Sequence, residues 1–88
     1  MKTEFKVSFL KAVKKIRDRQ LKEEVANTIL QVEEASDISK IESVVKHKGY
    51  REYYRIRLGD YRIGLRITGE TVYFVEIAHR KDIYKLFP

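Results

Sequence analysis

Arginines dominate one side of a predicted β-hairpin that spans residues 53–67. In YYRIRLGDYRIGLRI, apolar residues alternate strictly with polar ones, and this period of two is typical of half-buried strands. Nearly every polar position is an arginine: Arg55, Arg57, Arg62 and Arg66. Guanidinium groups stay charged and bind phosphate oxygens through paired hydrogen bonds. The residue types therefore favour an anion-binding surface, with phosphate as a suitable ligand.

The turn of this hairpin sets the expected pairing of the strands. Gly59 fits the first central position of a two-residue type II′ loop, where φ must be positive. Arg57 then lies opposite Arg62, and Arg55 lies opposite Gly64. Like charges directly across a sheet are destabilising, so this pairing favours anion binding over the alternative, an ordinary solvated strand face. Gly64 would leave a gap through which a ligand could approach the backbone.

The flanking segments predict the elements that hold the hairpin. Residues 3–7 alternate as a strand does, and two amphipathic helical stretches follow, the second spanning about residues 21–35. Residues 71–79 form the most apolar predicted strand. A three-residue turn before this strand sets Arg62 opposite Glu76, the one obvious countercharge in that register.

The order β, α, α, β, β, β predicts an α+β fold. We expect a single domain over residues 1–88, with an antiparallel sheet, both helices packed on its apolar face and the basic face left open. Residues 41–48 are ambiguous, with a strand possible from Val44, and residues 80–88 suit either a short helix or an extended edge.

Composition narrows the class of protein. The 88 residues are 43% hydrophobic, which suits a modest core, and carry a formal net charge of +6. A small basic domain favours nucleic acid, an anionic membrane surface or an acidic protein as its partner. Cysteine is absent, which excludes disulfides and cysteine-based metal sites, and no apolar run has transmembrane length. We therefore expect a cytoplasmic protein without a metal ion or other cofactor.

A second set of reactive residues lies in AHRKDIY, near the C-terminus. Arg80 can bind phosphate, and Tyr84 carries a phenol, although a tail tyrosine is more often a packing anchor. His79 has no second histidine near it in sequence, and His47 lies in the ambiguous segment. A Ser-His-Asp triad, a P-loop and a GxGxxG fingerprint are all absent from the sequence.

YYRIRLGDYRI followed by HRKDIY closely resembles the RelE group of the RelE/ParE toxins of bacterial and archaeal toxin–antitoxin pairs. The likeness covers nearly the whole chain in size, element order, hairpin and tail. It implies a ribosome-dependent endoribonuclease that cuts messenger RNA in the decoding site, and an acidic antitoxin encoded beside it. By position, it also implies these catalytic residues: Arg55, Arg57, Arg62, Arg80 and Tyr84. Two of the hairpin positions can be lysine in such toxins, whereas here both are arginine.

The chemistry of RNA cleavage suits these residue types. RNA supplies its own nucleophile, the 2′-hydroxyl, and arginines supply the electrostatic stabilisation that is usually the largest catalytic effect. Because arginine is almost never neutral and nearby cations favour a phenolate, we assign Tyr84 as the provisional base, with Glu76 and His79 in reserve. Arg80 is assigned to the phosphate or the leaving oxygen. Further residues are expected to contact RNA: Lys46, Lys48, Arg66, His79 and Lys81.

Two other functions stay open at this stage. Toxins of the ParE group share the expected fold but inhibit DNA gyrase without nuclease chemistry, and their tails look less like this one. A basic RNA- or DNA-binding module unrelated to toxicity would also carry an arginine face. Toxicity on expression separates the module from the toxins, and messenger cleavage separates the two toxins.

Overall fold

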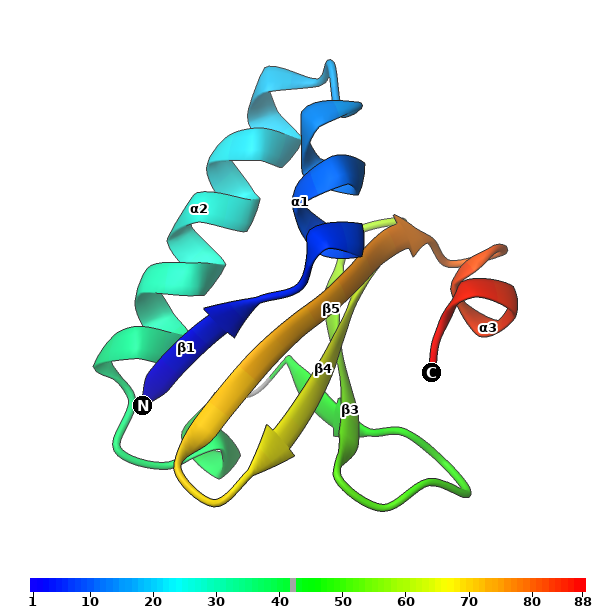
Figure 1. Cartoon of the computed structure of the whole chain (residues 1–88). Helices are drawn as coiled ribbons and strands as arrows, with labels where there is room; N and C mark the ends of the chain where they lie inside the picture. Colours follow the sequence, from blue (N-terminus) through cyan, green and yellow to red (C-terminus); the bar gives the residue numbers. More distant parts are fainter. Residues whose placement is uncertain (42) are drawn as a thin grey trace.

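The computed structural model describes residues 1–41 and 43–88. Its elements, in chain order, are β1 (Lys2–Phe5), α1 (Val7–Lys14), α2 (Arg19–Glu34), the 3₁₀ turn η1 (Ile38–Lys40), β2 (Val44–Lys46), β3 (Tyr53–Leu58), β4 (Tyr61–Thr68), β5 (Thr71–His79) and α3 (Ile83–Leu86). The five strands form one twisted sheet in the order β1-β5-β4-β3-β2. Figure 1 shows α1 and α2 together on one side of the sheet, with α3 apart from them.

The architecture confirms the predicted α+β class, with two differences in the sheet. β2 forms within the ambiguous segment and pairs with β3 in the antiparallel sense. β1, whose place in the sheet the sequence leaves open, pairs with β5 in the parallel sense, so the sheet is mostly but not entirely antiparallel. A parallel pair needs a long connection, and here every element from α1 to β4 lies between the two strands in sequence.

The core lies between the helices and one face of the sheet. Its buried side chains come from α1, α2 and the three central strands: Phe9, Leu21, Val25, Val32, Ile56, Ile63, Leu65, Val72, Phe74 and Ile77. Each large apolar side chain contributes about 1.5–3 kcal/mol when it is fully buried. Because successive strand residues point to opposite faces, burying this set directs the arginines of β3 and β4 to the other face.

The predicted pairing of β3 with β4 is confirmed. Arg57 lies opposite Arg62, and Arg55 lies opposite Gly64. The connecting loop has a positive φ of 61° at Gly59 but not at Asp60, as a type II′ loop requires.

The predicted pairing of β4 with β5 was wrong. The turn has two residues instead of three, with a positive φ of 57° at Gly69, and an irregularity between Gly64 and Leu65 shifts the register. Arg62 therefore lies opposite Ala78, and Glu76 lies opposite Gly64. A bulge places one extra residue on one strand, which period-two alternation cannot reveal.

The C-terminal tail covers part of the face that carries the arginines, and Arg57 on that face stays exposed. Ile83 and Phe87 of the C-terminal tail are buried against Ala78, with Tyr53 and Val75 packed around them. Gly64 does not admit a ligand, because the ring of Phe87 occupies its space: a Cβ built on Gly64 would lie 2.6 Å from that ring. The tail has apolar residues to bury, and a glycine on the sheet gives an aromatic ring room to lie against the backbone.

Asp18 caps the N-terminus of α2. Its carboxylate accepts hydrogen bonds from the backbone N–H groups of Gln20 and Leu21, at 2.9 and 3.3 Å. We expect Asp18→Ala to lower the free energy of unfolding by about 0.5–2 kcal/mol, because two helical N–H groups lose their acceptor. Asp18→Ser restores an acceptor and is the matched control. Urea unfolding monitored by circular dichroism measures both, and equal stability of the two variants would contradict the capping role.

Candidate active site

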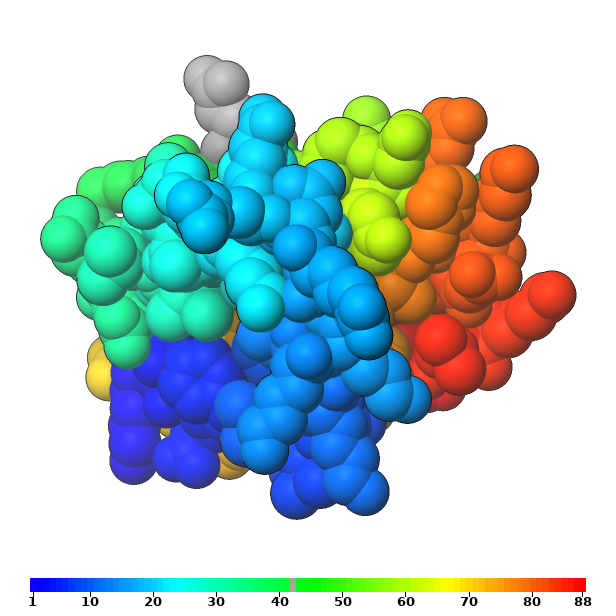
Figure 2. Space-filling view, turned by 90° about the horizontal axis from the view of Figure 1, so that it is seen from above, coloured from blue at the N-terminus to red at the C-terminus, as the bar shows by residue number. Residues whose placement is uncertain are grey.

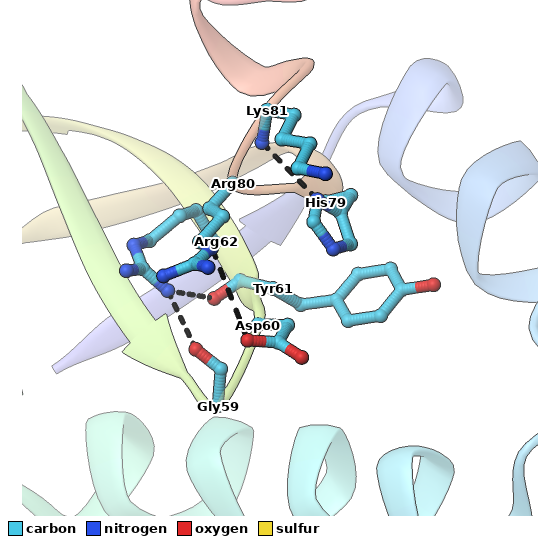
Figure 3. Close-up of polar contacts among 7 residues, drawn as sticks. All are labelled: Gly59, Asp60, Tyr61, Arg62, His79, Arg80 and Lys81. Carbon is cyan, nitrogen blue, oxygen red and sulfur yellow. Dashed lines mark hydrogen bonds and ion pairs between the residues drawn. The ribbon is translucent and has the colours of Figure 1, made fainter.

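The residues predicted to act on RNA gather into two groups on the arginine face of the sheet. The turn cluster lies where the β3–β4 loop meets the end of β5, and comprises Asp60, Arg62, Arg80 and Lys81 (Figure 3). The edge cluster lies where β2, β3 and α3 meet, and comprises His47, Tyr50, Arg55, Tyr84 and Phe87. Arg57 links them: it lies opposite Arg62 and is two residues from Arg55 on the same strand.

The hairpin loop holds the two arginines of the turn cluster. One terminal nitrogen of Arg62 donates to the carbonyl oxygens of Gly59 and Tyr61, at 2.7 and 2.8 Å. The backbone N–H of Arg80 donates to the Asp60 carbonyl at 2.7 Å, and its side-chain Nε lies 3.9 Å from the Asp60 carboxylate. That ion pair is exposed and therefore weak. Arg62 is thus fixed in place with donors to spare, and a phosphate can compete for Arg80.

Cations and aromatic rings build the edge cluster. The terminal nitrogen of Arg55 lies 3.2 Å from Nδ1 of His47. Its guanidinium carbon also lies 5.5 Å from the centre of the Tyr84 ring. The rings of His47 and Tyr84 stack with centroids 5.6 Å apart and planes inclined by 27°. Tyr84 is 63% exposed, so its phenol lies at the surface beside a half-buried arginine, where a bound RNA strand can reach it.

His47 is a central residue of this site that the sequence did not single out. Only 4% of its surface is exposed. Burial, together with the positive charge of Arg55, holds the pKa of His47 below its ordinary value. A signal was available: Val44 and Val45 begin an alternation that places His47 on the face of Val45, and Val45 pairs with Arg55. The sequence does not reveal that β2 pairs with β3, so the alternation alone could not place His47 next to Arg55.

The remaining predicted residues fall in different places. Arg57 is exposed and has no side-chain partner within residues 1–41 and 43–88. Arg66 lies 3.9 Å from the carboxylate of Glu52, and Lys48 is exposed in the loop before β3. Lys46 pairs with Tyr54, whose side chain packs against the helical core, so the structure does not bring Lys46 to the arginine face.

The two reserve candidates for proton transfer have other contacts. Glu76 accepts a hydrogen bond from the backbone N–H of Ile77. It also lines a groove of about 570 Å³ beside α1, where it offers no countercharge to Arg62, contrary to the predicted register. His79 accepts a hydrogen bond at Nδ1 from the backbone N–H of Lys81, at 3.2 Å, and its ring meets the edge of Tyr61. His79 pairs with Tyr61, whose side chain packs against the helical core, so the structure does not bring His79 to the arginine face.

Residues 1–41 and 43–88 contain no group of three or more histidine, cysteine, aspartate or glutamate side chains placed to hold a metal ion. None of the helices described is long and apolar enough to span a membrane.

Comparison with known proteins places this chain in a family. A family model described as ParE toxin of type II toxin–antitoxin system, parDE, matches residues 3–84. Toxin RelE3 of Methanocaldococcus jannaschii is 35% identical over 89 aligned positions that cover the whole of both chains. A crystal structure of the RelB–RelE antitoxin–toxin complex from Methanococcus jannaschii contains a chain that is 33% identical and superposes with a TM-score of 0.81, covering 96% of this chain and 98% of that one.

The fold extends to more distant relatives. A chain of the intact Escherichia coli RelBE toxin–antitoxin complex is 20% identical and has a TM-score of 0.71, covering 89% of this chain and 94% of that one. This identity shows a shared fold alone. Together with the family model and the full-length relative, it leads to one conclusion: the chain belongs to the RelE/ParE family of toxins of type II toxin–antitoxin systems, as a toxin of RelE type.

Proposed function

We propose that this toxin is an endoribonuclease that cuts messenger RNA in the decoding site of the ribosome and thereby inhibits translation. The observation that carries the proposal is the placement of Tyr84 against Arg55, with further arginines along the same face of the sheet. This combination offers a phenol for proton transfer beside several phosphate-binding cations. The likeness to a RelE toxin over the full chain supports the same activity.

In the proposed reaction, the 2′-hydroxyl of the nucleotide attacks the adjacent phosphorus. A bond forms between that oxygen and phosphorus, the bond from phosphorus to the 5′-oxygen breaks, and a cyclic phosphate remains. Tyr84, as phenolate, accepts the proton of the 2′-hydroxyl. Arg55, Arg57 and Arg62 stabilise the negative charge that builds on the phosphate. Arg80, held beside the hairpin loop, stabilises the negative charge on the leaving 5′-oxygen, which takes its proton from water.

Mapping of RNA 5′ ends after brief induction of the toxin in cells tests this reaction. We expect new ends within translated messages for the wild type and almost none for Tyr84→Phe, which lacks the phenol oxygen. Tyr54→Phe is the matched control and is expected to cut as the wild type does, because the side chain of Tyr54 packs against the helical core, on the other face of the sheet. Equal cleavage by wild type and Tyr84→Phe would remove Tyr84 from the reaction.

Ribosomes are expected to stimulate cleavage strongly. The described site contains cations and the exposed phenols of Tyr50 and Tyr84 but no pair of side chains suited to act as acid and base together, so substrate positioning must supply much of the rate. Purified toxin should therefore cut messenger RNA in programmed ribosomes and leave the same RNA nearly intact when it is free. Gel analysis of end-labelled RNA measures both rates, and efficient cleavage of free RNA would refute the ribosome requirement.

A gyrase-directed activity is the second candidate, because the family model that matches this chain is described as ParE toxin, and toxins of the ParE group inhibit DNA gyrase. The tail tyrosine beside arginines and the full-length RelE relative favour the nuclease. Growth arrest with intact messages and altered DNA supercoiling would establish the gyrase activity instead.

The partner of this toxin is proposed to be an acidic antitoxin encoded beside it. A net charge of +6 on 88 residues favours fast capture by an oppositely charged chain, and the similar structures are complexes of toxin with antitoxin. Coexpression with the product of the neighbouring small gene should give a complex that copurifies and relieves growth arrest. Separate elution of the two chains at low salt would exclude that product as the antitoxin.

A further inference from the structure

His47 is the most constrained polar side chain of the edge cluster. Its backbone N–H donates to the Tyr53 carbonyl at 2.8 Å, and its carbonyl accepts from the backbone N–H of Tyr50. Its ring lies within 5.3–5.6 Å of three aromatic rings, those of Tyr50, Tyr84 and Phe87. The imidazole is therefore held by both its backbone and its ring, next to the two side chains to which the proposed reaction assigns charge stabilisation and proton transfer.

The contact with Arg55 fixes the protonation of this ring. Arginine has only hydrogen-bond donors, so Nδ1 of His47, 3.2 Å from the Arg55 nitrogen, must be the acceptor. The ring is then neutral and carries its proton on Nε2. A protonated ring would turn a donor toward Arg55 and place two positive groups in contact.

We propose that neutral His47 is the positioning residue of the site: its Nδ1 accepts a hydrogen bond from the Arg55 guanidinium, and its ring stacks against the ring of Tyr84. This role rests on the proposed function, since Arg55 and Tyr84 act on the scissile phosphate. Protonation of His47 releases Arg55 and disorders the site, so cleavage falls in acid.

The charged and titratable groups around His47 favour its neutral form. Within residues 1–41 and 43–88, Arg55 on β3 is the one charged side chain in contact with the ring, while Tyr50 from the loop between β2 and β3 and Tyr84 from α3 face it with their aromatic rings. Lys46 and Lys48 flank it in sequence and are exposed. No carboxylate of residues 1–41 or 43–88 is in contact with the ring to favour its protonation. Burial and Arg55 both oppose the charged form.

Two substitutions separate the functions of the ring. His47→Phe keeps an aromatic ring under Tyr84 and removes the acceptor for Arg55. His47→Asn keeps an acceptor oxygen near the position of Nδ1 and cannot be protonated. For His47→Phe we expect kcat of ribosomal cleavage to fall about ten-fold, as for loss of one hydrogen bond to a charged group, with KM little changed. Adding His47→Phe to Arg55→Ala should cause no further fall, because the group that it positions is already absent.

The pH profile distinguishes this role from simple packing. Wild-type kcat should decline below about pH 6.5, the ordinary pKa of histidine, and the decline should be centred lower because the pKa of His47 is lowered. Neither variant should show the decline beyond that common to the ribosomal assay. Thermal melts at each pH establish that the compared proteins are folded.

Nuclear magnetic resonance of the free, full-length toxin provides a readout that needs no cleavage. The ring nitrogens of His47 should report the Nε2–H tautomer at pH 7, and this preference should weaken in Arg55→Ala. If the wild type cut no message, the proposed function would be lost, while the tautomer would still decide how Arg55 is held. An Nδ1–H tautomer, or full activity of His47→Phe at every pH, would overturn the positioning role.

Discussion

Replacing Arg57 by threonine is expected to lower kcat for messenger cleavage by about 100- to 1,000-fold while the fold is kept. Loss of one preorganised donor to a charged transition state has an effect of this size. Arg57 is exposed and lies directly opposite Arg62. Such a like-charge pair costs about 0.2–1 kcal/mol, so the variant should be as stable as the wild type or slightly more stable. Single-turnover cleavage in ribosomes and thermal melts at low salt measure the two effects.

Arg19→Thr is the matched control for this prediction. It removes the same charge from the start of α2, on the side of the sheet away from the arginines (Figure 1). It should leave kcat near the wild-type value, which separates loss of a phosphate ligand from loss of net charge. Full activity of Arg57→Thr would show that the residue is an ordinary solvated arginine, and unfolding of this variant would show that it is structural.

Arg62 is expected to behave differently from Arg57, although the sequence alone treats them as equals. Its guanidinium is hydrogen-bonded to two carbonyl oxygens of the hairpin loop. Arg62→Glu therefore loses these bonds together with a phosphate ligand, and its stability falls where that of Arg57→Thr does not. The loop that closes the hairpin thus also fixes the orientation of the Arg62 guanidinium.

Local patterns in the sequence were sufficient to predict the hairpin and the helices. Alternation over β3 and β4 and the glycine at the loop determine their pairing, because each strand residue has one face and one partner. Each helix shows its own apolar stripe. The positions of Arg55, Arg57 and Arg62 follow from these local rules, and the structure places them where the pattern indicates.

The parts that could not be predicted depend on contacts between distant segments. The extra residue in β5 changes the partner of Arg62, and nothing in the sequence of β5 marks it. The sequence predicts a ligand gap above Gly64 because the tail that fills this space lies more than twenty residues later in the chain. His47 meets Arg55 and Tyr84 only because β2 pairs with β3 at the edge of the sheet and α3 folds back against the same edge. The register of β5, the filling of the space at Gly64 and the position of His47 all depend on tertiary packing between short elements.

The tail provides the other large effect that we expect. Phe87 is 1% exposed, and its ring lies against Gly64. The methyl group of Gly64→Ala would lie 2.6 Å from that ring, far inside van der Waals contact, so the tail must move. Overpacking of this kind costs about 1–3 kcal/mol. Tyr84 lies in the same short helix as Ile83, so the phenol leaves its place beside Arg55.

For Gly64→Ala we expect cleavage to fall about 100-fold, the effect of misplacing a reacting group by roughly 1 Å, and α3 amides to lose protection from hydrogen exchange while those of β4 keep it. The second change Phe87→Ala removes Cγ, Cδ1 and Cδ2, the ring atoms that the new methyl group would meet. The double variant should therefore show cleavage and α3 protection equal to those of Phe87→Ala alone, because the new methyl group then has no ring to displace. Gly64→Ala with wild-type exchange and cleavage would mean that the tail is not docked on Gly64 in solution. A double variant with lower cleavage and protection than Phe87→Ala would mean that alanine harms the strand itself and not the contact with the tail.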